Sequence, residues 1–339
     1  MELSGIEDAY LNVSKHIYTH NYANLAHIMN DKIQFPKRTT FLSEDEKKRL
    51  TCDELLHIKD AIFITYINGV YSLICNIDKN ANMITHELVL PDTIQGISHN
   101  YNCYNAEAAP IALVSESIID FESVINSYKA KHIHTINDRD AVYAYVGQEK
   151  NEILESLDKI DTLFVVDGHH RLASTQYTKN KQNCLCAIMN IQSLKIQSIT
   201  RVMNQSLKPF DECIEYLIKE GHTIQSGREA LEGHVLIEYN GESVLVELLD
   251  RFSNYDTYLL HTQIISQAFG EYNSNNLRYE MSDYIAKPGE VVFKTQPVSV
   301  DEFITLAKEN VILPPKTTCF MPKLPSLLVL SVRDIKSPF

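Results

Sequence analysis

The sequence predicts an α/β (α+β) protein with a mixed β-sheet core and a second, smaller α/β domain. Short apolar runs rich in β-branched residues alternate with longer amphipathic stretches along most of the chain. Two Asn-Gly dipeptides, at 68–69 and 240–241, each separate two such runs, which is a strong local signal for a hairpin. With 339 residues, the chain is long enough for two hydrophobic cores.

The first predicted domain spans residues 1–207. Residues 1–60 are expected to be mainly helical, because "SEDEKKRLTCDELLHIKD" combines a Ser N-cap with acids early and bases later. Residues 61–78 predict a hairpin around the first Asn-Gly turn. Further strands are expected at 109–115, 163–167 and 183–191, and helices at 150–158 and 171–179.

The second predicted domain spans residues 208–339, where the alternating pattern restarts. A helix capped by Ser299 follows a strand, with two acids in its first turn. Four prolines between 314 and 325 predict an extended loop before a last apolar strand. The remaining elements are helices at 211–220 and 257–269 and strands at 234–239 and 242–249.

Composition and charge restrict the classes of function. The net charge of −13 argues against general nucleic-acid binding, which needs a basic surface, although a local basic pocket for a nucleotide remains compatible. The seven cysteines are scattered and lack paired CxxC spacing, which favours reduced thiols in a cytoplasm. Cys184 and Cys186 are expected on one buried face of a strand. With no apolar leader and no run of membrane-spanning length, a soluble cytoplasmic protein is expected.

The stretch "LFVVDGHHRLAST", residues 163–175, predicts a strand-to-helix turn that carries the candidate chemistry. Gly168 lets the backbone bend, and the N–H groups of the following helix form an anion site. Arg171 adds a fork of donors for phosphate oxygens, and His169 and His170 supply further donors. Asp167 can bind a metal ion, accept a proton or hold a hydroxyl. The alternative is an ordinary turn with the aspartate as helix N-cap.

Two other stretches have weaker functional signals. "ITHEL" places His86 beside Glu87, a pair that also fits an exposed surface. "PPKTT" offers Lys316, Thr317 and Thr318 in a loop stiffened by prolines, which fits phosphate oxygens or an ordinary loop. The sequence has no P-loop, GxGxxG, HExxH or GxSxG motif and no zinc spacing, so phosphate chemistry would need a different cradle.

Three motifs in this order, "THEL", "VVDGHHRLAST" and "LPPKTTCFMPKLP", resemble those of the ParB/sulfiredoxin-like superfamily. The chain looks like the free L-serine kinases of that superfamily, and like a bacterial group that shares the DGHHR and PKTT motifs. The resemblance covers roughly residues 60–335. It implies a ParB-like mixed-sheet core and phosphoryl transfer from ADP or ATP to the hydroxyl of free L-serine. The implied product is O-phosphoserine, and Mg²⁺ is the implied cofactor.

The resemblance also implies roles for individual residues. Glu87 matches the catalytic glutamate that takes the proton of the serine hydroxyl. Asp167 is the second residue for which we expect a catalytic role. Gly168, His169, His170 and Arg171 match the turn that binds nucleotide phosphates. Lys316, Thr317 and Thr318 match a C-terminal loop that closes over the site. Along the sequence, many more residues separate Glu87 from Asp167 than in the compact serine kinases, which implies an inserted element between them.

Two other functions fit the same motifs. One is a ParB-like regulator that binds a nucleotide without chemistry, and the other is a phosphatase acting on phosphoserine. Arg201 is a candidate for reaching the phosphate site, whereas His261 on an apolar helix is expected to be structural. Tyr177 and Tyr279 could stack on an adenine, but packing is the commoner role of such residues. The metal ligands and the oligomeric state stay open.

Overall fold

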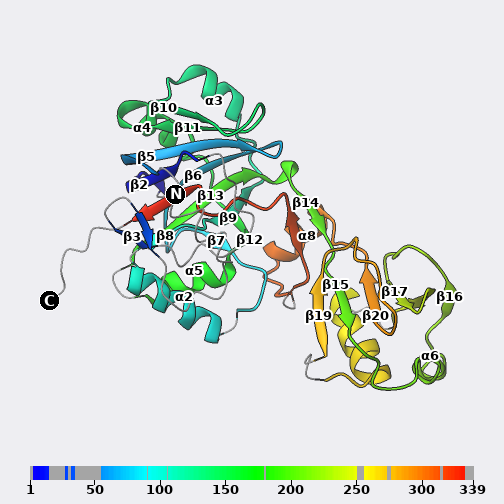
Figure 1. Ribbon diagram of the computed structural model, residues 1–339. Coiled ribbons are helices and arrows are strands. Elements are labelled where there is room, and N and C mark those ends of the chain that lie inside the picture. The colour runs from blue at the N-terminus through cyan, green and yellow to red at the C-terminus, as the bar shows by residue number, and fades with distance from the viewer. Residues whose placement is uncertain are drawn as a thin grey trace. The chain divides into compact units, whose positions relative to one another are not determined.

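The computed structural model describes residues 3–14, 27–29, 32–34, 55–89, 91–104, 106–178, 181–249, 256–272, 276–313 and 316–332. The chain forms two compact units. The first comprises Met1–Leu194 together with Pro322–Phe339, and the second comprises Lys195–Met321. Strands and helices are mixed in both units, which confirms the predicted α+β class (Figure 1).

The first unit is built on one mixed sheet in the order β7-β12-β9-β13-β6-β5-β2-β22-β8. The strands β13 and β9 pair in parallel, whereas β12 and β9 are antiparallel. The path strands are β2 (Ile6–Asn12), β5 (Leu55–Ile67), β6 (Val70–Asp78), β7 (Met83–Ile84), β8 (Ala106–Glu107), β9 (Ile111–Ser115), β12 (Leu163–Asp167), β13 (Asn183–Asn190) and β22 (Val329–Val332). The same sheet also includes β1 (Leu3–Ser4), β10 (His132–Thr135) and β11 (Ala141–Tyr145), which lie off this path. The strands β3 (His27–Met29) and β4 (Lys32–Gln34) form a separate two-stranded sheet.

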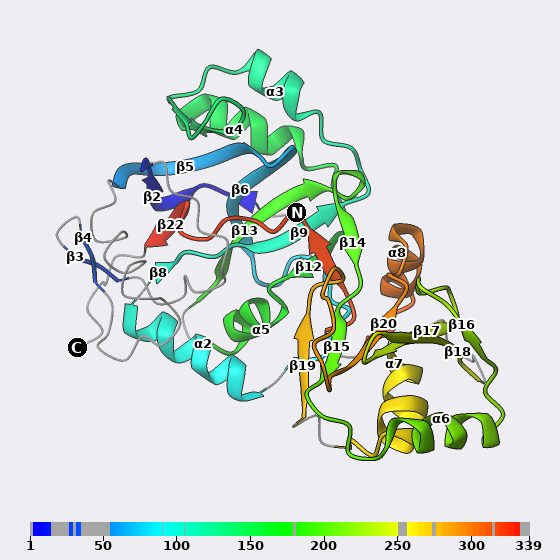
Figure 2. The ribbon, with the colours of Figure 1, turned by 45° about the vertical axis from the view of Figure 1, so that its right-hand side comes forward.

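Both faces of this sheet are buried. Along β5, Ile62 and Ile64 belong to one hydrophobic cluster, whereas Ala61 and Phe63 belong to another. This alternation follows the period-2 geometry of a strand. Both views of the ribbon show α2 and α5 side by side, away from α3 and α4 (Figures 1 and 2). The helices of this unit are α2 (Pro91–Tyr104), α3 (Phe121–Ser127), α4 (Gly147–Ser156), α5 (His169–Tyr177) and the short 3₁₀ turn η2 (Ile191–Ser193).

The predicted hairpin at 61–78 is confirmed. Ile67 pairs with Val70, and the two residues between them are Asn68 with φ 52° and Gly69 with φ 82°. Positive φ at both central positions is the requirement of a type I′ turn, whose twist matches that of the strands. The strands predicted at 109–115, 163–167 and 183–191 are also present as β9, β12 and β13.

The predicted N-terminal helical region, residues 1–60, is wrong where the structure describes it. Ile6–Asn12 forms β2, and β5 already begins at Leu55. The strand β2 pairs with β5 on one side and with β22 on the other, so tertiary pairing decides its conformation. The helix signal at 43–54 lies outside the described residues.

The second unit contains a six-stranded antiparallel sheet in the order β16-β18-β17-β20-β15-β19. The strands of this sheet are β15 (Thr200–Met203), β16 (Ile224–Ser226), β17 (His234–Tyr239), β18 (Glu242–Glu247), β19 (Leu277–Glu280) and β20 (Val291–Thr295). A separate two-stranded sheet consists of β14 (Lys195–Gln197) and β21 (Cys319–Met321). Its helices are α6 (Phe210–Lys219), α7 (Asp256–Leu259), the π-helix η3 (Leu260–Ala268) and α8 (Val300–Lys308). The helices and strands predicted between 208 and 308 are present, although most of the helix predicted at 257–269 is a π-helix. Ser299 caps α8 by accepting a hydrogen bond from the Glu302 N–H. The loop predicted at 314–325 includes β21 and lies partly outside the described residues.

The units divide at other positions than the predicted domains 1–207 and 208–339. The division falls after Leu194, because β14 pairs with β21 and β15 pairs with β19 and β20. The segment after Met321 returns to the first unit, where β22 pairs with β2 and β8. The roles assigned to the two domains stay predictions.

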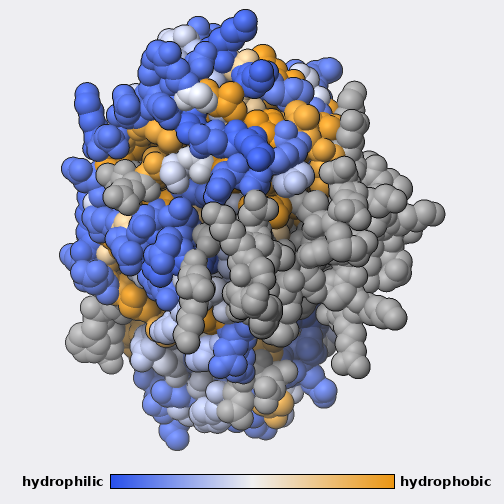
Figure 3. Space-filling view, turned by 90° about the vertical axis from the view of Figure 1, so that its left-hand side faces the viewer, coloured by the Kyte–Doolittle hydropathy of each residue, from blue (hydrophilic) through white to orange (hydrophobic). Residues whose placement is uncertain are grey.

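The cysteines of the described core are reduced and buried. Cys184 and Cys186 lie on β13 in one hydrophobic cluster, as predicted, and the Sγ atoms of Cys75 and Cys186 are 3.6 Å apart. Burial raises the pKa of the Cys184 thiol to about 12, so it stays protonated. No helix among the described residues is long and apolar enough to cross a membrane. On the face shown in Figure 3, the described surface is mostly hydrophilic, with apolar residues scattered over it.

Candidate functional site

The turn between β12 and α5 requires a glycine at position 168. Gly168 has φ 91°, in the left-handed region, and it is the N-cap of α5. A Cβ atom there would lie 2.9 Å from Nε and Nη2 of Arg171 and 3.0 Å from Cγ2 of Ile111. The helix begins at His169, earlier than predicted, so the aspartate is not its N-cap. The alternative prediction, an ordinary turn with Asp167 as the helix N-cap, is therefore wrong.

The N-terminus of α5 supplies backbone donors. The first bond within the helix runs from the Leu172 N–H to the Gly168 carbonyl, at 2.9 Å. The first four N–H groups of an α-helix have no acceptor inside it, and the helix dipole adds a partial positive charge there. The N-cap residue, Gly168, makes no side-chain cap bond. The turn therefore has the backbone geometry of an anion site.

The Asp167 carboxylate is held between two cations. Nη2 of Arg171 donates to Oδ2 at 2.6 Å, and Nζ of Lys323 donates to Oδ1 at 3.1 Å. Nη2 of Arg171 also donates to the Pro110 carbonyl at 3.1 Å. Burial alone would raise the pKa of Asp167, but the charges of Arg171 and Lys323 outweigh it and hold that pKa well below its usual range. The carboxylate thus stays charged and fixes both cations beside the helix N-terminus.

Glu87 comes to the same edge of the sheet as Asp167. The short strand β7 pairs in parallel with β12, with Met83 opposite Leu163 and Ile84 opposite Phe164. Glu87 and Asp167 both follow this paired stretch by three residues, so the two residues stand at the same end of the paired strands. The strand β12 also has a register shift against β9 just before Asp167, an irregularity that re-aims side chains.

His86 lies in the site, which the sequence did not predict. It is 1% exposed and not part of a surface pair, and its Nδ1 lies 3.2 Å from Nε2 of His169. Burial lowers the pKa of His86 to about 4, and burial together with the neighbouring imidazole lowers that of His169 to about 3. Both rings are therefore neutral near pH 7, and one nitrogen of the contact donates to the other.

Lys323 is the second residue that the sequence reading missed. It stands in the C-terminal block quoted above, where a lysine between prolines gives no sign of a partner in DGHHR. Its pairing depends on the return of the segment after Met321 to the first unit. His170 is half-buried in the first turn of α5, and its predicted role in phosphate binding stays a prediction.

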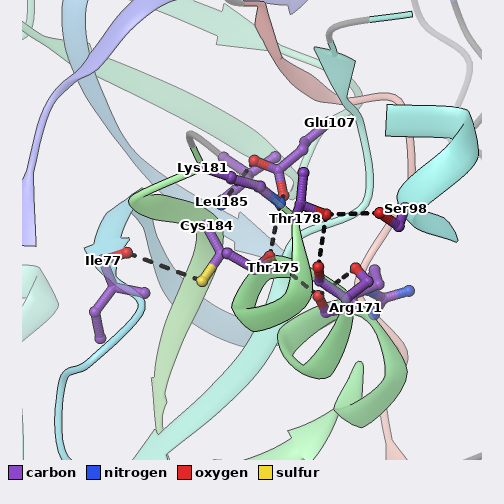
Figure 4. Close-up of polar contacts among 10 residues, drawn as sticks. Ile77, Ser98, Glu107, Arg171, Thr175, Thr178, Lys181, Cys184 and Leu185 are labelled. Atoms are coloured by element: carbon purple, nitrogen blue, oxygen red, sulfur yellow. Dashed lines mark hydrogen bonds and ion pairs between the residues drawn. The ribbon is translucent and has the colours of Figure 1, made fainter. Parts of the chain in front are cut away.

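The C-terminal part of α5 is anchored by a buried polar network (Figure 4). Nζ of Lys181 lies 2.7 Å from both Oε1 of Glu107 and Oγ1 of Thr175. The hydroxyls of Ser98 and Thr178 are 2.8 Å apart and join α2 to the end of α5. Lys181 is only 3% exposed, so its ion pair is largely shielded from water. The network holds the helix in place while its N-terminus faces the turn.

The predicted loop residues Lys316, Thr317 and Thr318 belong to the second unit. Lys316 is exposed and has φ 62°, and its carbonyl accepts a 2.8 Å bond from Nη2 of Arg201. Arg201 is completely buried and also donates through Nε to Nε2 of His261 at 3.3 Å. Arg201 therefore supports this loop, and His261 is structural, as expected.

Thr317 lines an acidic cavity of about 670 Å³ in the second unit. The wall also carries carboxylates, from Glu232, Asp256, Glu302 and Glu309. A phosphate group is repelled by such a wall. Thr318 is half-buried and Lys316 is exposed, and the phosphate-binding role of the three residues stays a prediction.

The turn fits Mg²⁺ as an ion carried by phosphate. Within the described ranges, no group of three or more His, Cys, Asp and Glu side chains could hold a metal ion. Both oxygens of Asp167 already accept bonds from cations. Mg²⁺ commonly keeps several waters and binds through substrate phosphates with few protein ligands, which is compatible with this arrangement.

Replacing Gly168 is expected to destabilise the protein by more than the free energy that a non-glycine residue costs in the left-handed region alone. Gly168→Ala adds the close contacts with Arg171 and Ile111, so we expect a loss of about 2–4 kcal/mol in the free energy of unfolding. Gly147→Ala is the matched control, because Gly147 has φ 62° and nothing within 4 Å of its Cβ position. Equal losses in urea denaturation of the two variants would contradict the close approach.

The buried histidine pair is expected to make stability fall between pH 6.5 and about 4. In this range the unfolded chain binds protons that the folded His86 and His169 exclude, so stability rises with pH. The loss by about pH 4 is about 3 kcal/mol for each histidine, and Asp167 contributes only at lower pH. Urea denaturation at several pH values, compared with His86→Gln/His169→Gln, checks this. An identical change of the free energy of unfolding with pH in the wild type and the double variant would refute this prediction.

Comparison with known proteins gives a family and several structural matches. A family described as "Protein of unknown function (DUF1015)" matches residues 70–264. Structural matches include a mutant free serine kinase in complex with ADP, with 16% identity, a TM-score of 0.45, and coverage of 75% of this chain and 92% of that chain. SbnI with a C-terminal truncation from Staphylococcus aureus has 14% identity, a TM-score of 0.45, and coverage of 76% and 86%. The search of curated proteins found no match.

Proposed function

This chain belongs to the DUF1015 family, and we propose that it is a nucleotide-dependent kinase for a small hydroxy amino acid, with free L-serine as its substrate and ADP or ATP as its donor. The observation that carries this proposal is the parallel pairing of β7 with β12. It brings the glutamate-bearing segment to the end of the sheet at which the anion-binding turn begins. A phosphoryl acceptor and a phosphate group can thus be held at one place.

The turn provides the phosphate half of the proposed site. Arg171, Lys323 and Asp167 together carry one net positive charge, in a chain whose net charge is −13. The N–H groups in the first turn of α5 point in one direction and add the positive end of the helix dipole. Phosphoryl transfer depends mainly on alignment and charge neutralisation, and these groups supply both. Phosphate-bound Mg²⁺ would further neutralise the transferring group.

Glu87 provides the acceptor half of the proposed site. A carboxylate beside the acceptor orients the hydroxyl and accepts its proton late in the transfer. The hydroxyl oxygen forms a bond to the terminal phosphorus, and the bond from that phosphorus to the bridging oxygen of the nucleotide breaks. The proton passes to Glu87, and the products are O-phosphoserine and AMP or ADP.

Transfer of a labelled terminal phosphate tests this proposal. The purified protein is incubated with Mg²⁺, ADP or ATP labelled at its terminal phosphorus, and L-serine, and the amino acids are separated. L-alanine is the matched acceptor, since it differs only by the hydroxyl. Label on serine and none on alanine is expected. Stabilisation by nucleotides without labelled product would favour a nucleotide-binding regulator, and release of phosphate from phosphoserine without nucleotide would favour a phosphatase.

A further inference from the structure

The contact between His86 and His169 restricts where the protons of both rings lie. The atoms that meet are Nδ1 of His86 and Nε2 of His169, 3.2 Å apart, with the ring planes at 83°. The residues are 1% and 6% exposed. Two N–H groups facing each other at this distance would repel, so one of the two nitrogens must present its lone pair.

The backbone of β12 determines which nitrogen accepts. His86 makes a hydrogen bond to the backbone of Val165 that favours its protonated form, as a bond to a carbonyl oxygen does. A carbonyl only accepts, so His86 donates to it. A neutral imidazole has a single N–H, and Nδ1 faces His169, so His86 donates through Nε2. Its Nδ1 then accepts the Nε2 proton of His169.

We propose that His86 is a positioning residue that fixes the proton of His169 on Nε2, so that Nδ1 of His169 accepts a hydrogen bond from the ligand. A lone pair at Nδ1 repels phosphate oxygens, which are also acceptors. The group that meets His169 must therefore carry a donor. Resting on the proposed function, that donor is the hydroxyl of the acceptor amino acid, which His169 orients while Glu87 receives the proton.

The proton positions can be measured directly on the unmodified protein. Long-range ¹H–¹⁵N NMR correlations of ¹⁵N-histidine-labelled protein near pH 7 distinguish the two neutral tautomers of each ring. We expect the Nε2–H tautomer for both His86 and His169. Finding His169 with its proton on Nδ1, or either ring doubly protonated, would overturn the inference. This spectrum does not depend on catalysis, so it stands or fails separately from the proposed kinase activity.

Two substitutions at His86 separate positioning from bulk packing. His86→Gln keeps an acceptor for His169 and a donor for Val165, whereas His86→Leu keeps neither. We expect His86→Leu to give His169 a mixture of tautomers and to lower kcat about tenfold or more, with the KM for the nucleotide changed by less than about threefold. His86→Gln should restore the single tautomer and most of kcat.

The control is His222→Gln, which replaces a buried histidine of the second unit that contacts the Glu247 carbonyl. It should leave the spectrum of His169 unchanged. A single Nε2–H tautomer of His169 in folded His86→Leu would show that His86 does not set it, and the proposal would be wrong. If the wild type transfers no phosphate, kcat is undefined, and the tautomer measurements alone decide whether His86 positions His169.

Discussion

Glu87→Gln is expected to reduce turnover at least about 100-fold while nucleotide binding stays within about threefold of the wild type. The amide keeps the size of the side chain but cannot take the hydroxyl proton. Arg171 and Lys323, the proposed phosphate ligands, are both paired with Asp167. Steady-state kinetics and calorimetric titration with ADP measure the two quantities separately.

The matched control for this variant is Glu155→Gln, which changes an exposed glutamate on α4 and the same amount of charge. It should keep normal turnover. A near-normal rate in Glu87→Gln would remove Glu87 as the base. A large loss of nucleotide affinity in that variant would show that the residue acts in phosphate binding instead.

Arg171→Ala is expected to weaken nucleotide binding about 30-fold or more and to lower the free energy of unfolding by about 3 kcal/mol. The side chain is 9% exposed and connects the Asp167 carboxylate to the Pro110 carbonyl, so its removal takes one donor from each acceptor and leaves Asp167 with Lys323 alone. Arg171→Lys keeps the charge but not the planar fork, and an intermediate loss of affinity is expected.

These measurements use protein that is still folded, with affinity taken from titration with ADP and stability from urea denaturation. Arg139→Ala, at an exposed arginine of the same unit, controls for the loss of one positive charge. Unchanged affinity in a folded Arg171→Ala protein would show that phosphate does not bind at this turn. Equal losses in both variants would indicate a general charge effect.

Local sequence was sufficient where a structure depends on neighbouring residues. The β12–α5 turn and the hairpin at Asn68-Gly69 need particular backbone angles, which glycine and asparagine supply, so both could be predicted from a few letters. The N-cap of α8 is a similar case, because Ser299 and the Glu302 N–H are close in sequence.

Sequence reasoning failed where a residue depends on a distant partner. The strand β2 lies between β5 and β22, which come from far along the chain, and this pairing overrides its helical signal. His86 has its role through the pairing of β7 with β12, and Lys323 through the return of the chain to the first unit. The residues next to His86 and Lys323 in the sequence do not depend on these distant contacts, so no local pattern could predict either role.

The central claim is that phosphoryl transfer takes place at the β12–α5 turn, and ³¹P NMR tests it most directly. Wild type and Asp167→Ala are each incubated with Mg²⁺, L-serine and either ADP or ATP. Because Asp167 fixes both Arg171 and Lys323, the account predicts a phosphoserine resonance in the wild type that is absent in the folded variant. A phosphoserine signal of equal size in both proteins, or none in the wild type with either nucleotide, would contradict it.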